Sequence, residues 1–115
     1  MAGGLVEVNH RERNKAFTDA AVESAGGECA EKHRADAARR IAEGAAEYGE
    51  EGYTNRDCAR EAAEEFIDAA NWLGFEFIKI ADDAPRDETR LLCEAASAAV
   101  NAHDIVQRYL KLRDG

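Results

Sequence analysis

The sequence predicts an all-α fold, and three observations lead to this prediction. Alanine and glutamate, both strong helix formers, are abundant, and the 115 residues include only one proline. Apolar residues recur at helical spacing in four segments, which glycine, aspartate or proline separate. The length suits one domain, so we expect residues 1–115 to form a single four-helix, bundle-like domain. Because alanine is by far the commonest of its hydrophobic residues, we expect oligomerisation to complete the bundle.

The first two helices are expected on either side of Gly26 and Gly27. Asn9, followed three residues later by Glu12, is typical of an N-cap, and apolar residues then recur at helical spacing. The two glycines end this helix, and the next is expected from about residue 28 to Tyr48. The apolar positions that share one face of the second helix are Ala38, Ile41, Ala42, Ala45 and Tyr48.

The third and fourth helices are expected after the linker 49–53 and near Pro85. Thr54 and Asp57 give a capping signal for a helix that runs to about residue 81. Its apolar stripe consists of Phe66, Ala70, Leu73, Phe77 and Ile80. The segment 72–80 is apolar on nearly every side, so we expect it to be buried among helices or at a subunit interface. Pro85 suits the first turn of the fourth helix, whose predicted seam is Leu91, Ala95, Ala98, Ala102, Val106 and Tyr109.

The charge of the chain argues against two classes of partner. Its net charge of −9 disfavours binding to nucleic acid and to anionic membrane surfaces, because both are negative. A basic cluster at Arg11, Arg13 and Lys15 is outnumbered by acidic residues elsewhere. No run approaches the roughly 18 apolar residues that span a bilayer, and the start lacks the apolar core of a signal peptide. The three cysteines have no disulfide or zinc spacing. We therefore expect a soluble, cytoplasmic protein that binds neither nucleic acid nor membrane.

Several carboxylates lie at helical spacing on the third helix, opposite its apolar stripe. Glu61, Glu65 and Asp68 fall on one face together with Trp72. Clustered carboxylate oxygens suit a hard divalent cation such as Mg²⁺ or Mn²⁺. A solvated helix face is the alternative interpretation. Aromatic residues on this side, Trp72 and Phe75, favour a binding site or a subunit interface.

These residues also resemble a known family. Glu65-Phe66-Ile67-Asp68, preceded by Glu64 and followed by Ala-Ala-Asn-Trp-Leu, is similar to the Glu-x-x-Asp motif of the MazG-like, all-α nucleoside triphosphate pyrophosphohydrolases. Small forms carried by phages and actinobacteria are the most similar, and the resemblance covers roughly residues 35 to 82. In that family one helix supplies a Glu-x-x-Glu pair and the next supplies Glu-x-x-Asp. Together they bind the Mg²⁺ that holds the triphosphate.

The first motif has two possible matches. Glu47-Tyr48-Gly49-Glu50 fits the pattern literally, but Gly49 and Gly52 predict that the helix ends at Tyr48 and leave Glu50 in a loop. The pair Glu43 and Glu47 is spaced by four residues rather than three. A solvated surface, with Arg40 as an ion-pair neighbour, also explains Glu43 and Glu47.

The resemblance implies hydrolysis of a nucleoside or deoxynucleoside triphosphate to a monophosphate and pyrophosphate. It implies Mg²⁺ or Mn²⁺ bound by Glu65, Asp68 and one or two of Glu43, Glu47 and Glu50. Glu61 or Glu64 would then act as the general base. Trp72 would stack on the nucleotide base or pack against a partner subunit, and Tyr48, beside the linker, would contact the substrate or pack in the core.

The expected partners are therefore a nucleotide triphosphate and further copies of the chain, in a dimer or a tetramer. The alternative function is a non-catalytic helical protein of phage type, which binds a host protein or a nucleotide signal. It accommodates the uncertain first motif without requiring a complete metal site.

Overall fold

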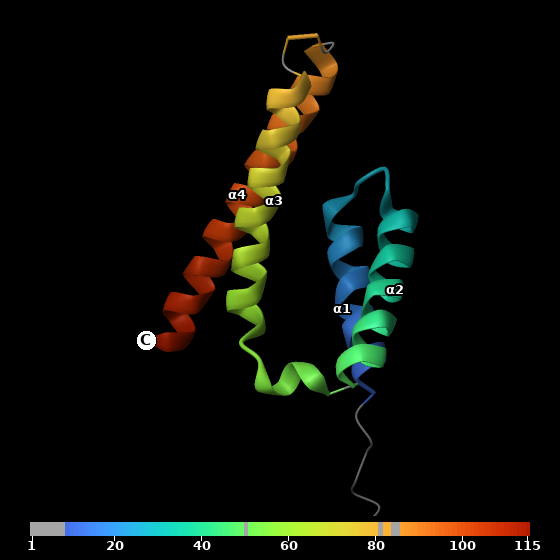
Figure 1. The fold of residues 1–115 in the computed structure, drawn as a ribbon. Helices are drawn as coiled ribbons and strands as arrows, with labels where there is room; N and C mark the ends of the chain where they lie inside the picture. Colours follow the sequence, from blue (N-terminus) through green and yellow to red (C-terminus); the bar gives the residue numbers. More distant parts are fainter. Residues whose placement is uncertain (1–8, 50, 81, 84–85) are drawn as a thin grey trace, which may run out of the picture. The chain divides into compact units, whose positions relative to one another are not determined.

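The computed structural model describes residues 9–49, 51–80, 82–83 and 86–115. Within these ranges the chain forms four α-helices, one short 3-10 helix and no strand (Figure 1). The predicted all-α, four-helix fold is confirmed. The chain divides into two compact units, Met1–Arg56 and Asp57–Gly115.

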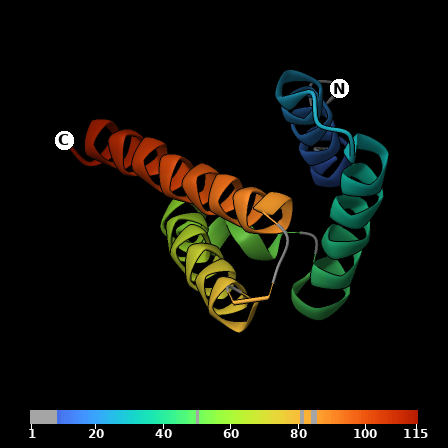
Figure 2. The same ribbon diagram turned by 90° about the horizontal axis from the view of Figure 1, so that it is seen from above.

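The first unit contains α1 (His10–Ala25), α2 (Ala30–Tyr48) and the 3-10 helix η2 (Gly52–Asn55). Asn9 caps α1 as predicted, because its side-chain oxygen accepts a hydrogen bond from the backbone N–H of Glu12 at 3.0 Å. Gly26 ends α1 with a left-handed φ of 65°, which glycine adopts without the strain of a side chain. The turn that follows lets α2 pack back against α1, and Figure 2 shows the two helices from above.

Helices α1 and α2 bury little apolar surface between them. Val22 is the one buried residue among the described residues of this unit. The outer surfaces carry i,i+4 ion pairs instead, including Lys32–Asp36 at 2.7 Å and Arg39–Glu43 at 2.9 Å. Such exposed pairs contribute little stability each. This unit is therefore held by a thin apolar contact and by local interactions within each helix.

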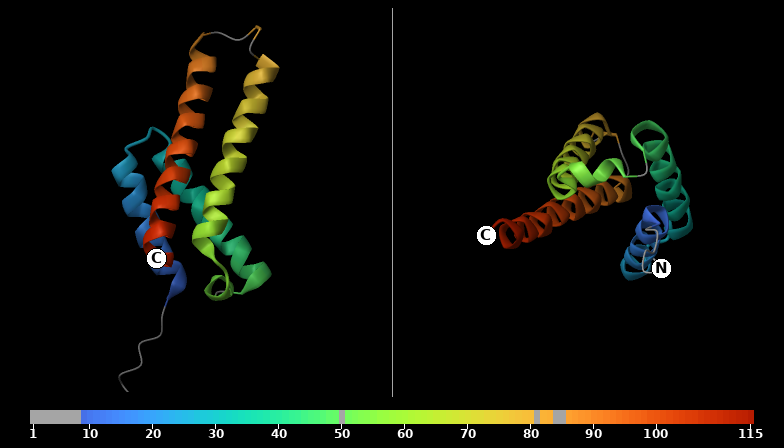
Figure 3. Two further views of the ribbon diagram at one scale, coloured as in Figure 1. Left: turned by 90° about the vertical axis from the view of Figure 1, so that its left-hand side faces the viewer. Right: turned by 90° about the horizontal axis from the view of Figure 1, so that it is seen from below.

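The second unit is an antiparallel pair of long helices, α3 (Cys58–Ile80) and α4 (Arg86–Asp114), which lie side by side (Figures 1 and 3). Residues of low exposure recur along each helix at alternating spacings of three and four. In α3 the set is Ala59, Ala62, Phe66, Ala69, Leu73, Glu76 and Ile80, and buried Ala63 and half-buried Glu61 and Ala70 are outside it. In α4 the set is Thr89, Leu92, Ala96, Ala99, His103, Val106 and Leu110, and half-buried Ala102 is outside it. This heptad spacing is that of a coiled coil, and we call the two sets the inner seam.

An ion cluster closes one end of this helix pair. Asp57 accepts two hydrogen bonds from the guanidinium of Arg113, at 2.9 and 3.0 Å, and one from the backbone N–H of Arg60 at 3.2 Å. The Arg60 guanidinium also reaches Asp114 at 2.6 Å. The hydrogen bonds from the Arg113 guanidinium, together with the bond from the Arg60 N–H, lower the pKa of Asp57 to about 2. Asp57 therefore caps α3 and anchors the C-terminal end of α4 to it.

Two predictions about the ends and faces of the helices need correction. Thr54 does not cap α3: it lies in η2, where its hydroxyl donates to the backbone oxygen of Glu51 at 2.8 Å, and Asp57 alone has the cap geometry. The predicted seam of α4 shares Val106 with the inner seam, but its other five residues are each displaced by one position. Leu91 and Tyr109 are exposed, whereas their neighbours Leu92 and Leu110 face α3. The helix carries two adjacent apolar stripes, and α3 packs on the second one.

The strongly apolar segment 72–80 is only partly covered. Leu73 and Ile80 are half-buried in the inner seam, while Trp72, Phe75 and Ile78 are exposed. The side chains that α4 covers are those at heptad positions, because one helix can cover only one face of another. Whether a further subunit covers the remaining side chains stays a prediction.

Candidate functional site

The predicted carboxylates of α3 lie on the side of the helix that faces away from α4. Glu64, Glu65 and Asp68 are exposed, and Glu61 is half-buried. We call these four residues the carboxylate face of α3. The exposure of Glu65 and Asp68 agrees with their predicted place opposite the apolar stripe, whereas Glu61 is half-buried.

Many acidic residues in the described part of the chain have a cation nearby, but three members of the carboxylate face do not. Glu76, on the same helix, is 3.5 Å from the amino group of Lys79. Glu64, Glu65 and Asp68 have no ion-pair partner among the residues that the structure describes. Three neighbouring negative charges without a counterion repel one another. A divalent cation or another basic group is the chemistry that this face can accept.

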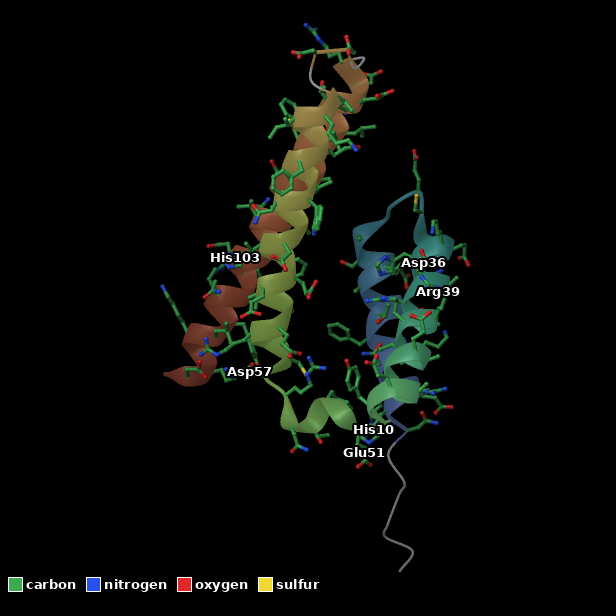
Figure 4. The ribbon with its side chains drawn as sticks, viewed as in Figure 1. His10, Asp36, Arg39, Glu51, Asp57 and His103 are labelled. Carbon is green, nitrogen blue, oxygen red and sulfur yellow. The ribbon has the colours of Figure 1, made fainter. Side chains whose placement is uncertain are left out.

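The predicted ligands on α2 have different surroundings. Glu43 accepts a hydrogen bond from Arg39 at 2.9 Å and lies 3.9 Å from Arg40 (Figure 4 labels Arg39). The Glu47 carboxylate accepts from the Tyr48 hydroxyl, which raises the pKa of Tyr48. Glu50 lies outside the described residues. The ion-pair interpretation of Glu43 thus matches the structure, with Arg39 as the closer partner.

The predicted metal ligands are divided between the two units. Glu43 and Glu47 belong to the first unit, and Glu65 and Asp68 to the second. Within either unit, the described residues contain no group of three histidine, cysteine, aspartate or glutamate side chains that could hold a metal ion. Neither unit by itself therefore supplies a complete Mg²⁺ site from the described residues. Oxygen donors of this kind suit Mg²⁺ chemically.

The two aromatic residues predicted to contact substrate are both exposed. Trp72 is 72% exposed and makes an edge-on contact with Phe75, with ring centroids 6.1 Å apart. Tyr48 lies at the end of α2, where the guanidinium of Arg56 is 5.6 Å from its ring centroid. An exposed indole can stack on a nucleotide base, and it can equally pack against another protein.

A cleft between α1 and α2 was not predicted. Its volume is about 220 Å³, and charged residues at its edge include Arg11, Lys15, Asp19 and Arg34. Asp19 lies 2.7 Å from the Lys15 amino group and 3.5 Å from Arg34 Nε. The Lys15 hydrogen bond is the main reason why the pKa of Asp19 is lowered. Asp19 therefore offsets part of the positive charge, which weakens this cleft as an anion site. The i,i+4 spacing of Lys15 and Asp19 was the available signal.

A second group missed from the sequence joins the start of α1 to η2. The His10 ring nitrogens contact the Tyr53 hydroxyl and, at 3.2 Å, the Glu51 carboxylate (Figure 4). His10 and Tyr53 also make an edge-on ring contact. These residues are more than 40 positions apart in the chain, so no local pattern linked them.

Comparison with protein-family models, with curated proteins and with solved structures finds no match to this chain. Among the helices in the described ranges, none is long and apolar enough to cross a membrane.

Proposed function

We propose that the chain is a Mg²⁺-dependent nucleoside triphosphate pyrophosphohydrolase that acts in the cytoplasm. It hydrolyses a nucleoside or deoxynucleoside triphosphate to a monophosphate and pyrophosphate. The observation that carries this proposal is the carboxylate face of α3, where Glu64, Glu65 and Asp68 are exposed and without a cation among the described residues. The resemblance of residues 65–68 to the MazG-like motif supports the same chemistry.

Each residue of the site has a role in the proposed reaction. Glu65 and Asp68, three residues apart and so one helical turn apart, would hold the metal from α3. Mg²⁺ bound there would neutralise phosphate charge and lower the pKa of an attacking water. Glu61 or Glu64 would serve as the general base. Trp72 is one further turn along the same face, where its exposed indole stacks on the base.

In the MazG-like family a second helix supplies further ligands, and the resemblance assigns that role to one or two of Glu43, Glu47 and Glu50. Glu43 must then exchange its hydrogen bond with Arg39 for the metal. Replacement of this bond by a metal contact is feasible because the Arg39 and Glu43 side chains are both more than half exposed, and exposed ion pairs are weak.

Nucleotide hydrolysis tests the proposal directly. Incubation with Mg²⁺ and a panel of ribo- and deoxyribonucleoside triphosphates should release pyrophosphate from at least one of them. Glu65→Gln should slow that release at least about a hundredfold, because a lost ligand misplaces the metal-bound phosphate and water. Mn²⁺ should support the reaction in place of Mg²⁺.

The matched control is Glu88→Gln, a change of the same charge at an exposed position on α4 outside the proposed site. It should leave the rate unchanged. Release of orthophosphate instead of pyrophosphate, or equal rates for Glu65→Gln and the unmodified chain, would contradict the assignment.

A second candidate function is a non-catalytic helical binding protein. Trp72, Phe75 and Ile78 expose a broad apolar surface on α3, which is typical of a protein-binding face. If no nucleotide is cleaved but one raises the melting temperature, the chain binds that nucleotide as a signal. If nucleotides have neither effect, the apolar surface supports a protein partner, such as a host protein bound by a phage protein.

A further inference from the structure

Helix α4 carries a second apolar stripe beside the inner seam. Its members are spaced alternately by four and three residues, and they are Leu91, Ala95, Ala98, Ala102, Ile105, Tyr109 and Leu112. We call this set the outer stripe. Leu91, Ile105 and Tyr109 are each more than half exposed, and Leu112 is 87% exposed. The outer stripe extends over about 32 Å at 1.5 Å per residue. It has the heptad spacing of a coiled-coil seam but no helix of the same unit packed on it.

Polar residues beside the outer stripe change from acidic to basic along the helix. Glu94, Asn101 and Arg108 follow at intervals of seven residues, on the side of the stripe away from α3. All three are exposed. In a coiled coil these are flanking positions, which select the partner and its direction. The order acidic, neutral, basic is complementary to itself when one copy is turned end to end.

A second copy whose α4 runs antiparallel therefore places opposite charges beside each other along these flanking positions. With the two-fold axis at Val100, Glu94 of each copy lies within two residues, about 3 Å along the helix, of Arg108 of the other, so two opposite-charge pairs form. A parallel copy would place like charges at the same height and would form neither pair. Arg108 has no ion-pair partner among the described residues, so this contact would give it one. Glu94 bonds Arg90 at 2.7 Å in an exposed pair and has a second carboxylate oxygen available.

The same register matches large side chains of the outer stripe with small ones. Ile105 lies opposite Ala95 of the other copy, and Ala98 lies opposite Ala102. Only Leu91 and Tyr109 form a layer of two large side chains, near the ends of the contact. Alanine layers in the centre allow two helices to approach closely, and larger side chains at both ends then close the contact. A two-fold interface requires one patch to be complementary to itself, and the outer stripe with its flank meets that requirement.

We propose that the outer stripe of α4 is a self-association surface on which a second copy of the chain docks its own α4 antiparallel, with Glu94 beside the partner's Arg108. Two α3–α4 pairs then form one four-helix assembly. This interface is separate from the carboxylate face of α3, and it does not depend on the proposed hydrolase activity.

Charge reversal tests both the surface and its direction. Sedimentation equilibrium of the unmodified chain should show a dimer at micromolar concentration. Glu94→Arg and Arg108→Glu should each raise the dimer dissociation constant at least about tenfold, since each change turns two attractive contacts into two repulsive ones. An equimolar mixture of the two variants should form a heterodimer, and the double variant should return to within about threefold of the unmodified chain.

The matched control is Asp104→Arg, which makes the same charge change at an exposed position on another side of α4. It should leave the dissociation constant unchanged. Ile105→Asp should give a monomer with unchanged helical circular dichroism, which separates loss of docking from loss of folding. A monomer at several hundred micromolar would overturn the proposal. So would a dimer that is insensitive to both single charge reversals.

Discussion

The two units of this chain are both helical pairs, but different interactions hold them together. In the second unit the inner seam extends along α3 and α4 and ends in the Asp57–Arg113 ion cluster, and Ala63 and Leu110 are buried. In the first unit Val22 is the buried residue of the described part, and ion pairs within single helices dominate the surface. Stability should therefore depend on tertiary packing in the second unit and on local helix interactions in the first.

This difference follows from how apolar residues are spaced in each helix. An uninterrupted alternation of three and four keeps a narrow stripe on one side of a helix for its whole length. Helices α3 and α4, with 23 and 29 residues, have that alternation, whereas α1 has 16 residues and a short apolar face. Long seams add burial turn by turn, so the second unit should be the last part of the chain to open.

The largest expected effect is the loss of core packing in the second unit. Leu110 is 5% exposed, so Leu110→Ala should destabilise this unit by at least about 2 kcal/mol through lost burial and a residual cavity. Amide hydrogen exchange should show the loss in α3 and α4. Leu112→Ala, at an 87% exposed position two residues away, is the matched control. In dilute solution, where the chain is monomeric, it should change the free energy of unfolding by less than about 0.5 kcal/mol. Equal effects of the two changes would contradict the assigned inner seam.

An intermediate effect is expected at the ion cluster, and it should depend on pH. The pKa of Asp57 is about 2, below its ordinary value of 3.8, so its contribution is present above pH 4 and is lost as the pH falls toward 2. Asp57→Asn retains a capping side chain but removes the charge. It should lower the amide-exchange protection of α3 and α4 at pH 7. Below pH 4 that protection should then fall less steeply with pH than in the unmodified chain.

The control for this change is Asp36→Asn in the first unit. Its carboxylate bonds Lys32, which lowers the pKa of Asp36, but the pair lies within one helix. Exchange in α3 and α4 should not respond to it. An unchanged acid profile in Asp57→Asn would show that the cluster does not anchor the two helices.

The sequence predicted the four helices well, because helix periodicity and caps are local signals. Asn9 and Gly26 have the predicted cap geometries. Periodicity was less informative for α4, where two apolar stripes lie one residue apart, a rotation of about 100° on a helix. Leu91 and Leu92 are equally apolar, so only packing against α3 decides which one is covered. Thr54 was assigned to the wrong element because a threonine in a 3-10 turn such as η2 has the same local sequence pattern as a threonine that caps an α-helix.

The candidate site was predictable only in part, for a similar reason. Outward exposure of Glu65 and Asp68 follows from the apolar face of their own helix. Convergence with Glu43 and Glu47 is a tertiary property, since the two pairs belong to different units. Local spacing also cannot separate a metal ligand from an ion-pair partner. Glu43 bonds Arg39, while Glu65 has no cation among the described residues, although both lie on polar helix faces.

The smallest expected effect concerns the local interactions that hold the first unit. Asn9→Ala removes the bond to the Glu12 N–H and should cost about 1 kcal/mol, a typical value for a lost N-cap. Asn9→Asp is the matched control, because aspartate accepts the same bond. With little tertiary burial to compensate, faster exchange should extend along α1 to Val22. If only the first turn responds, packing rather than capping holds α1, and the two units are more alike than their surfaces indicate.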